Sequence, residues 1–363
     1  APEDAGDWLV VRGARLHNLK GFTVRLPLRR LVVVTGVSGS GKSTLVREVL
    51  VPGVKSLIAA QDQAAGGSRR RGEPPRSSAR PALRGCDGLT GWKSLARVLE
   101  VDQTPIGKTP RSCPATYVGF WDPIRRLFAA TPEARMLGWG PARFSFNTAG
   151  GRCPACEGQG VQRLEMSFLP DVRLPCEVCG GSRFERETRE VRYRGLDVGQ
   201  VLDLDVDGAL DVFDAHRAIH HPLTLLQAVG LGYLRLGQPS PTLSGGEAQR
   251  IKLVTELAKA RPTLDGTNPR PTLYVLDEPT VGLHRADVER LVAVLHRLVD
   301  AGHTVLAIEH DLPLIAEADW VIDLGPEGGD QGGDVVAQGT PEEIAQGAGE
   351  LPTAAALRRW LGH

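Results

Sequence analysis

A glycine-rich stretch at the end of an apolar run constrains the fold more than any other part of this sequence. The run 31–34 is Leu-Val-Val-Val, and 36–43 reads Gly-Val-Ser-Gly-Ser-Gly-Lys-Ser before a helical segment at 44–60. This is a full G-x-x-x-x-G-K-[ST] pattern, in which backbone N–H groups and a helix N-terminus bind phosphate. Lys42 is expected to reach the β- and γ-phosphates, and Ser43 to offer its hydroxyl to Mg²⁺. The residues expected to contact ATP are Gly36, Ser38, Gly39, Gly41, Lys42, Ser43 and Thr44.

Two later strand ends carry polar residues that would suit the same site. The apolar segment 273–276 ends in Asp277 and Glu278, and the segment 304–308 is followed closely by His310. Beside a phosphate-binding loop, Asp277 would orient Mg²⁺ through its water shell, and Glu278 would polarise the attacking water. His310 would approach the γ-phosphate. The alternatives are an acidic turn that caps the next helix and a structural histidine.

The segment 243–247, Leu-Ser-Gly-Gly-Glu, predicts a capped helix that leaves room for a phosphate. Ser244 would cap the helix, and Gly245 and Gly246 would let a phosphate approach bare amides, with Glu247 in the same turn. A plain capping turn would explain Ser and Glu but not both glycines. With the other motifs in this order, the chain resembles the ABC-type ATPase superfamily. That resemblance implies that the signature of one cassette closes over nucleotide held by another.

Two pairs of cysteines predict a four-thiolate zinc site. Cys153 and Cys156 form one C-x-x-C pair, Cys176 and Cys179 the other, and 19 residues separate the pairs. This spacing is typical of structural zinc, although redox and disulfide readings remain open. The segment 161–169 is expected to form a strand of a small hairpin held by the metal. Cys86 and Cys113 are expected to be ordinary thiols.

Length and composition allow an α/β protein of two or three domains. The chain has 363 residues, with 43 basic and 43 acidic side chains, so no global charge draws it to nucleic acid. No apolar run reaches the 18 or so residues that span a bilayer. Reduced cysteine pairs favour a cytoplasmic location, and a start at Ala1 suggests a processed product or a fragment. The expected fold is an ABC-type P-loop ATPase core with an inserted helical signature domain that carries the four-cysteine zinc module.

The pattern of apolar residues predicts where the elements and domains lie. No internal repeat is found, so one cassette is expected. The expected strands are two at a sheet edge within 8–34, then 95–101, 272–276 and 304–308; the expected helices are 247–260 and 285–301. The expected divisions are a first core segment at 1–103, the insert at 104–239, a second core segment at 240–345 and a tail at 346–363.

Each of two arginine-containing stretches fits either a solvated surface or a surface that contacts phosphates. Residues 64–91 are rich in Gly, Ser, Pro and Arg and predict a flexible surface loop, with a phosphate-contacting arm as the alternative. The stretch 143–194 contains nine arginines and seven acids, with aromatic residues between them. It would suit a surface that contacts DNA phosphates, but a solvated face has the same composition.

Several longer strings resemble the C-terminal half of the UvrA family, the damage-recognition ATPases of bacterial nucleotide excision repair. These strings serve no general ATPase purpose, and the resemblance covers the chain except for about 60–90 and the last dozen residues. They are 35–44, 101–112, 143–147, 151–153, 168–172, 236–239 and 324–330.

The resemblance implies roles and partners beyond those that the motifs suggest. Gln103 would be the catalytic glutamine that links nucleotide state to the insert, and the zinc module would face damaged double-stranded DNA. Two cassettes would pair, as a homodimer or with an N-terminal half, and UvrB would bind through that other half. The alternatives are the nucleotide-binding subunit of an ABC transporter, a UvrA-like protein of drug self-resistance, and a non-catalytic structural partner.

Overall fold

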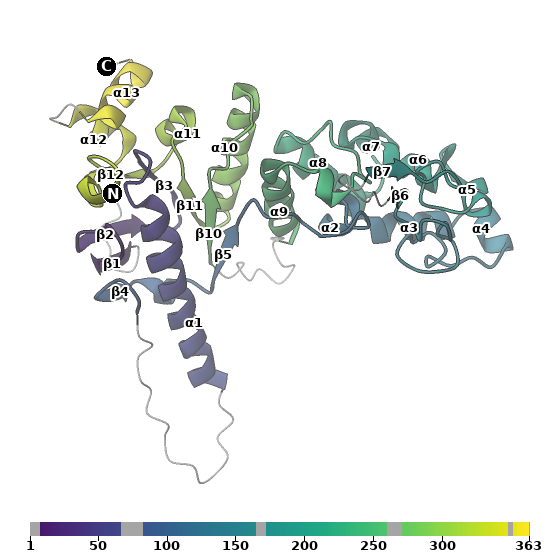
Figure 1. Cartoon of the computed structure of the whole chain (residues 1–363), viewed down its shortest axis with the longest axis horizontal. Coiled ribbons are helices and arrows are strands. Elements are labelled where there is room, and N and C mark those ends of the chain that lie inside the picture. The colour runs from purple at the N-terminus through teal and green to yellow at the C-terminus, as the bar shows by residue number, and fades with distance from the viewer. Residues whose placement is uncertain (1–7, 67–82, 165–171, 260–270, 348–350, 363) are drawn as a thin grey trace, which may run out of the picture. The chain divides into compact units, whose positions relative to one another are not determined.

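The computed structural model describes residues 8–66, 83–164, 172–259, 271–347 and 351–362 (Figure 1). Contacts divide the chain into two compact units, each with its own core. The first, called the core unit here, combines Ala1–Asp102 with Pro262–His363, and the second, the inserted unit, is Gln103–Arg261. The sequence-based division placed the second boundary at 240, whereas the contacts group the helix after Ser244 with the inserted unit.

A six-stranded sheet forms the centre of the core unit, in the order β13-β12-β3-β11-β10-β5. The strands are β3 (Leu31–Gly36), β5 (Arg97–Val101), β10 (Thr272–Asp277), β11 (Thr304–Ile308), β12 (Trp320–Gly325) and β13 (Asp334–Gly339). All neighbours are parallel except β12 and β13. The parallel strands β3, β10 and β11 are almost wholly buried, as expected for strands covered on both faces. Their carboxyl ends therefore meet at one edge of the sheet, where a doubly wound fold binds ligands.

The first two strands form a separate antiparallel sheet. β1 (Trp8–Ala14) pairs with β2 (Phe22–Pro27) on one side and with β4 (Gly88–Thr90) on the other. The expected strands within 8–34 are confirmed, but among the described residues they do not extend the main sheet. β4 lies within the stretch that was expected to be a loop, because Leu89 is apolar and 7% exposed against the core. Residues 67–82, with most of the arginines of that stretch, lie outside the described residues.

Helices follow the strands of the core unit. The elements are η2 (Thr44–Leu50, a π-helix), α1 (Val51–Gly66), η3 (Trp92–Ser94), α10 (Arg285–Asp300), α11 (Leu312–Ala316), η5 (Gly329–Gln331), α12 (Pro341–Gln346) and α13 (Pro352–Leu361). α10 buries Leu291, Leu295 and Leu298 on one face, the spacing of an amphipathic helix. The segment expected to be a tail contains α13, which packs against α11 and α12 through residues such as Leu357.

Short helices and two small hairpins make up the inserted unit. The helices are α2 (Pro114–Val118), α3 (Trp121–Ala129), α4 (Pro132–Met136), α5 (Arg186–Glu190), α6 (Val198–Asp203), α7 (Val206–Val212), α8 (Arg217–Ala228), η4 (Ser240–Thr242) and α9 (Gly245–Lys259). The hairpins pair β6 (Val161–Leu164) with β7 (Val172–Pro175), and β8 (Arg192–Tyr193) with β9 (Leu196–Asp197). The expected hairpin between the cysteine pairs is confirmed over 161–164, and 165–171 lie outside the described residues.

Aromatic side chains fill the core of the inserted unit. Phe144 and Phe146 are fully buried and Phe184 is 1% exposed, and they pack against neighbours such as Trp121 and Phe128. These three phenylalanines are therefore not available to stack on bases, which corrects that part of the expectation for 143–194. Tyr193 is half-buried, and Phe168 lies outside the described residues. Within the described part of the chain, no helix combines the length and the apolar composition that crossing a membrane requires.

Candidate nucleotide and metal sites

The phosphate-binding loop begins where β3 ends, at the carboxyl edge of the main sheet. Gly36 has a φ of +129°, and a Cβ there would lie 2.0 Å from the carbonyl oxygen of Leu324, so only glycine fits. Gly41 has a φ of +101°, and a Cβ there would lie 2.7 Å from a methyl group of Leu19. After this turn, Thr44 begins the helical segment η2. The loop therefore has the backbone path that lets successive amides point toward an anion.

Lys42 lies at the centre of the charged groups of this edge. Its ammonium donates hydrogen bonds to the carbonyl oxygens of Gly36 and Val37, both at 2.8 Å. Burial lowers the pKa of Lys42, while Glu278, Asp323 and Asp277 oppose that shift. The opposing effects mean that acidic groups from β10 and β12 surround the lysine. A triphosphate with Mg²⁺ suits this arrangement, because its negative charge would meet both the lysine and the loop amides.

A second glycine-rich loop, at 328–333, forms hydrogen bonds with the phosphate-binding loop. Asn18 donates from its side-chain amide to the carbonyl oxygens of Gly39 and Gly329, at 3.0 and 3.1 Å. The N–H of Gly329 donates to Gly39, and the N–H of Gly333 donates to Ser40. Sequence reasoning did not give Asn18 a role. The string 324–330, which resembles the UvrA family, pointed to the loop that Asn18 contacts. The sequence did not show that this loop bonds to the phosphate-binding loop.

Asp277 stands at the end of β10, as expected, and is paired with a basic residue. Its Oδ2 accepts a hydrogen bond of 2.8 Å from Arg47, which lies on η2, one turn after Ser43. The sequence gave no reason to single out Arg47. Arg47 therefore holds the aspartate beside η2, the helical segment that begins directly after Ser43.

Glu278 and His310 approach each other across neighbouring strand ends. The Nδ1 atom of His310 lies 4.0 Å from Oε1 of Glu278, and both side chains are substantially exposed. Glu278 has a φ of +45°, a conformation that costs energy for any residue with a Cβ, and its N–H donates to Ile308 at 2.9 Å. The strained backbone turns the carboxylate out of the strand direction. The core unit therefore brings Lys42, Asp277, Glu278 and His310 to one edge.

The signature segment lies in the inserted unit and has the expected cap. The N–H of Glu247 donates to the Ser244 hydroxyl at 3.3 Å, and the N–H of Ser244 donates to Oε2 of Glu247 at 2.7 Å, a reciprocal capping box at the start of α9. Tyr233 donates its hydroxyl to Oε1 of Glu247 at 2.6 Å. Although Tyr233 is 62% exposed, partial loss of water around its hydroxyl and the hydrogen bond to the Glu247 carboxylate raise the pKa of Tyr233 to about 12. Tyr233 was not among the expected residues.

Gln103 and the signature glycines meet within the inserted unit. A Cβ on Gly245 would lie 3.0 Å from Oε1 of Gln103 and 3.3 Å from its carbonyl oxygen. Gly245 therefore allows the close approach of Gln103, in addition to any approach by a phosphate. Gly246 follows within the first turn of α9. These residues belong to the inserted unit, whereas Lys42 belongs to the core unit.

The four cysteines form one buried cluster in the inserted unit. Their sulfur atoms all lie within 4.8 Å of one another, with 4.0 Å between Cys153 and Cys176 and 3.7 Å between Cys156 and Cys179. Four thiolates at about 2.3 Å from a tetrahedral zinc lie about 3.8 Å apart, whereas a disulfide requires about 2.05 Å. The geometry fits a metal and does not fit disulfides. The N–H of Gly160 also points at the Cys156 sulfur, at 3.3 Å.

The environment of the sulfur atoms agrees with a bound cation. Burial raises the pKa of Cys179 to about 12 and also raises the pKa of Cys153, whereas at Cys176 burial is outweighed by hydrogen bonds from the backbone of Cys179 and Val178, which lower the pKa. Thiolates in such a place need a positive partner to offset the loss of water. The other two cysteines lie apart from the cluster: Cys113 is buried at the start of α2, and Cys86 is half-buried in the core unit. That they are ordinary thiols stays a prediction.

Many arginines of the stretch 143–194 are bound within the inserted unit. Arg143 contacts Glu185 and Glu187, and Arg189 contacts Asp197. These ion pairs neutralise part of the basic charge that would otherwise face a nucleic acid. The arginines that form these pairs are therefore less available to contact phosphates, while the net charge of the stretch stays as its composition gives it.

Comparisons with known proteins identify relatives over nearly the whole chain. No family model matches it. It is 54% identical over 354 residues to the UvrABC system protein A of Thermus thermophilus, covering 98% of this chain and 34% of that protein. It is 49% identical over 356 residues to the UvrABC system protein A of Clostridium perfringens, covering 98% of this chain and 35% of that protein.

A solved structure agrees with the sequence relatives. The crystal structure of UvrA2 from Deinococcus radiodurans superposes with a TM-score of 0.81 and 48% identity, covering 99% of this chain and 40% of that one. The chain thus spans about one third of the length of its sequence relatives, at 34% and 35%. Identity near one half across 98% of the residues, together with the shared fold, shows that the chain belongs to the UvrA family.

Proposed function

We propose that the chain is an ATP-hydrolysing, zinc-binding ABC cassette that recognises damaged duplex DNA in nucleotide excision repair. One observation carries the proposal: the core unit gathers Lys42, Asp277, Glu278 and His310 at a single sheet edge. Because the chain belongs to the UvrA family, we infer that its ATP hydrolysis serves DNA repair. The names of the relatives give no support to a transporter subunit.

The hydrolytic step follows from the positions of these residues. Lys42 and the amides of 36–43 bind the β- and γ-phosphates of ATP, and their positive charge stabilises the oxygens as the γ-phosphoryl group leaves. Ser43 would hold Mg²⁺ through its hydroxyl and Asp277 would orient the metal through its water shell, and the metal would supply positive charge that offsets the phosphate charge. Glu278 accepts a hydrogen bond from the attacking water and orients its lone pair toward phosphorus. His310, beside Glu278, donates to the γ-phosphate.

The signature residues act on a different nucleotide. Ser244, Gly245 and Gly246 present a helix N-terminus and bare amides, which bind the γ-phosphate held by a second cassette. Glu247 fixes Ser244 through the capping box, and Gln103, packed beside Gly245, reports whether that nucleotide is present. The second cassette is another copy of this chain or the other half of a longer protein. UvrB would bind through that other half.

The cysteine module supplies the DNA-directed part of the proposed function. Zinc held by the four thiolates folds a segment that has too little apolar core of its own. We infer that this module faces damaged DNA in the bacterial cytoplasm, where thiols stay reduced. Because many arginines nearby are paired, contacts to phosphate would come from the remaining basic side chains.

The decisive experiment measures steady-state phosphate release with and without DNA, on protein of known zinc content. Undamaged duplex, duplex with one covalent lesion, and duplex with an intercalated drug are compared at equal concentration. Repair predicts that the lesion changes the turnover rate most, and the drug self-resistance alternative predicts that the drug does. No phosphate release under any condition would contradict the ATPase assignment. DNA affinity should also fall steeply as salt is added, because phosphate contacts release counterions.

A further inference from the structure

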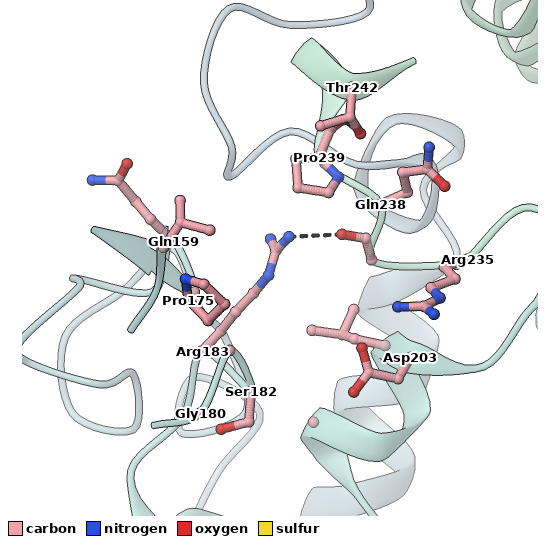
Figure 2. Close-up of a pocket in the computed structure, with 16 residues that line it drawn as sticks. Gln159, Pro175, Gly180, Ser182, Arg183, Asp203, Arg235, Gln238, Pro239 and Thr242 are labelled. Carbon is pink, nitrogen blue, oxygen red and sulfur yellow. Dashed lines mark hydrogen bonds between the residues drawn. The ribbon is translucent and has the colours of Figure 1, made fainter. Parts of the chain in front are cut away.

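A cavity separates the cysteine module from the segment that leads into the signature helix. Its volume is about 670 Å³, and all of its lining residues belong to the inserted unit. Figure 2 shows Gln159, Pro175 and Ser182 on the module side, with Gln238 and Pro239 on the other side. The Arg183 side chain crosses this space (Figure 2). The cavity is thus spanned by one long side chain.

Arg183 is a buried arginine whose guanidinium bonds to backbone, not to acids, in the hydrogen bonds observed. It is 5% exposed, donates from Nη1 to the carbonyl oxygen of Pro110 at 3.1 Å, and donates from Nη2 to that of Gly237 at 2.6 Å. The guanidinium carbon also lies 5.0 Å from the centre of the Phe146 ring. Burial lowers the pKa of Arg183, and the opposing charges include Asp203 and the cysteine thiolates. Such a cation is retained only where its hydrogen bonds are satisfied.

The backbone of Arg183 is part of the cysteine module. Its carbonyl oxygen accepts a hydrogen bond of 2.9 Å from the N–H of Cys153, in the first pair. Its own N–H is directed at Cys179, in the second pair, where it lowers the thiol pKa against the effect of burial. Its φ of +72° is costly for a residue with a Cβ. A displaced metal module would therefore displace Arg183 directly.

The two carbonyl groups that Arg183 holds belong to the segments next to the nucleotide motifs. Pro110 lies seven residues after Gln103, and Gly237 lies seven residues before Ser244. These segments are also joined to each other: the N–H of Ala115 donates to Leu236 at 3.1 Å. In addition, Ser240 donates from its hydroxyl to Gly107 at 2.8 Å, and from its N–H to Ser112 at 2.8 Å.

We propose that Arg183 is a positioning residue that couples the cysteine module to the ATP-contacting signature. Through Gly237 it fixes the segment that ends in the Ser244 cap, and through Pro110 it fixes the segment that begins at Gln103. The alignment of both motifs then depends on the folded, metal-bound module. Arginine carries its donors on separate terminal nitrogens in a fixed planar fork, whereas lysine carries all of its donors on one nitrogen, so lysine would not reproduce the bonds from both Nη1 and Nη2. Only the measurement of ATP hydrolysis depends on the proposed function, and the rest of this proposal does not.

The test compares Arg183→Met and the milder Arg183→Lys with a matched control, Arg194→Met. Arg194 also has a positive φ, of +48°, and also donates to a backbone carbonyl, that of Val212 at 2.8 Å, but it is far more exposed. Three quantities are measured on each variant of the 363-residue chain. They are zinc per chain, amide hydrogen exchange in 236–248, and the kcat and KM of ATP hydrolysis.

We expect Arg183→Met to retain one zinc per chain while amides in 236–248 exchange at least about tenfold faster, since two hydrogen bonds to a charged group are lost. Its kcat should fall at least about tenfold with little change in KM. Arg183→Lys should recover part of both effects, and Arg194→Met should show neither. Removing zinc from the unmodified chain should raise exchange in the same segment.

Two results would overturn the coupling. One is a fully zinc-loaded Arg183→Met chain with unchanged exchange in 236–248, and the other is a zinc-stripped chain with unchanged exchange there. If the unmodified chain hydrolyses no ATP, the proposed function fails, but the exchange measurements still decide whether Arg183 couples the two regions. The two failures are therefore distinguishable.

Discussion

Glu309, which is fully buried, accepts hydrogen bonds from both the N–H and the hydroxyl of Thr280. The N–H bond measures 2.8 Å, and both donors reach Oε1. The other carboxylate oxygen accepts from the N–H of His310 at 2.7 Å and from that of Asp311 at 3.1 Å. One carboxylate thereby joins the turn after Glu278 to the turn of His310. The sequence pattern predicted a role for His310 but none for Glu309.

We expect Glu309→Gln to lower kcat at least about tenfold and leave the KM for ATP within about twofold. The amide has only one acceptor oxygen, so its NH₂ group would face N–H donors, and the two turns would separate. Unfolding free energy should fall by roughly 2–3 kcal/mol in urea titrations, because bonds to a buried charge are lost. The control is Glu317→Gln, an exposed acid near His296. Equal kcat in both variants would show that Glu309 has no positioning role.

Replacing the carboxylate of Glu278 should trap bound ATP. Glu278→Gln keeps the size of the side chain and removes the group that polarises water, so turnover should slow by about a hundredfold or more. Binding of ATP, measured with a fluorescent analogue, should persist because Lys42 and the loop are unchanged. The exposed Glu289→Gln variant of α10 serves as the control. Hydrolysis that remains normal at saturating ATP would remove Glu278 from this role.

Each cysteine of the cluster should be required for zinc. Cys179→Ser should reduce zinc content from one ion per chain to well below one, because a hydroxyl is a poor zinc ligand beside three thiolates. Thermal unfolding of the inserted unit should shift downward, since metal binding contributes to its folding. Cys86→Ser, in the core unit, should retain full zinc. Metal analysis by mass spectrometry decides the outcome, and full zinc in Cys179→Ser would rule out the four-thiolate site.

The bond from Tyr233 to Glu247 makes the signature cap sensitive to acid. Although burial opposes it, the bonds from Tyr233 and Ser244 lower the pKa of Glu247 below 4.5. A lowered carboxyl pKa stabilises the folded state above the unfolded value, and this stability is lost as pH falls through the folded value. Tyr233→Phe should therefore raise the pKa of Glu247.

The melting temperature of the Tyr233→Phe variant should be lower than that of the unmodified chain at neutral pH. This difference in melting temperature should shrink in acid below pH 4.5. The pKa of Tyr233 is about 12 in the folded chain, against an ordinary value of 10.0, so folding favours the neutral phenol. The stability that the neutral phenol contributes would be lost only as pH rises through 12. NMR titration of the Glu247 carboxyl provides the measurement. An unchanged Glu247 pKa in Tyr233→Phe would contradict the role of the hydrogen bond.

Two defective chains should restore each other if each signature completes a site on another cassette. Lys42→Ala removes phosphate binding and Ser244→Arg blocks the signature, so each alone should be inactive. In an equal mixture, half of the dimers are mixed and each holds one intact site, giving about a quarter of the normal rate. The rate per molecule of the unmodified chain should rise with concentration. A mixture as inactive as its components would exclude composite sites.

The sequence by itself determined the local chemistry of this protein. Apolar runs that end in Gly36 and Asp277 specified buried strands with polar ends, because parallel strands covered on both faces must be apolar throughout. The cysteine spacing predicted a four-sulfur cluster, because two C-x-x-C turns can present four thiols to one metal ion. These features depend on short segments, so the residues themselves carried the information.

Only the tertiary structure decided which distant groups meet. Arg47 reaches Asp277, Asn18 reaches Gly329, and Arg183 reaches Gly237, across separations that no local pattern encodes. Burial likewise placed Phe144, Phe146 and Phe184 in the core, and β1 and β2 in a sheet with β4, because packing against apolar neighbours outweighs any local preference. A motif fixes what a residue can do, but the folded chain fixes what it touches.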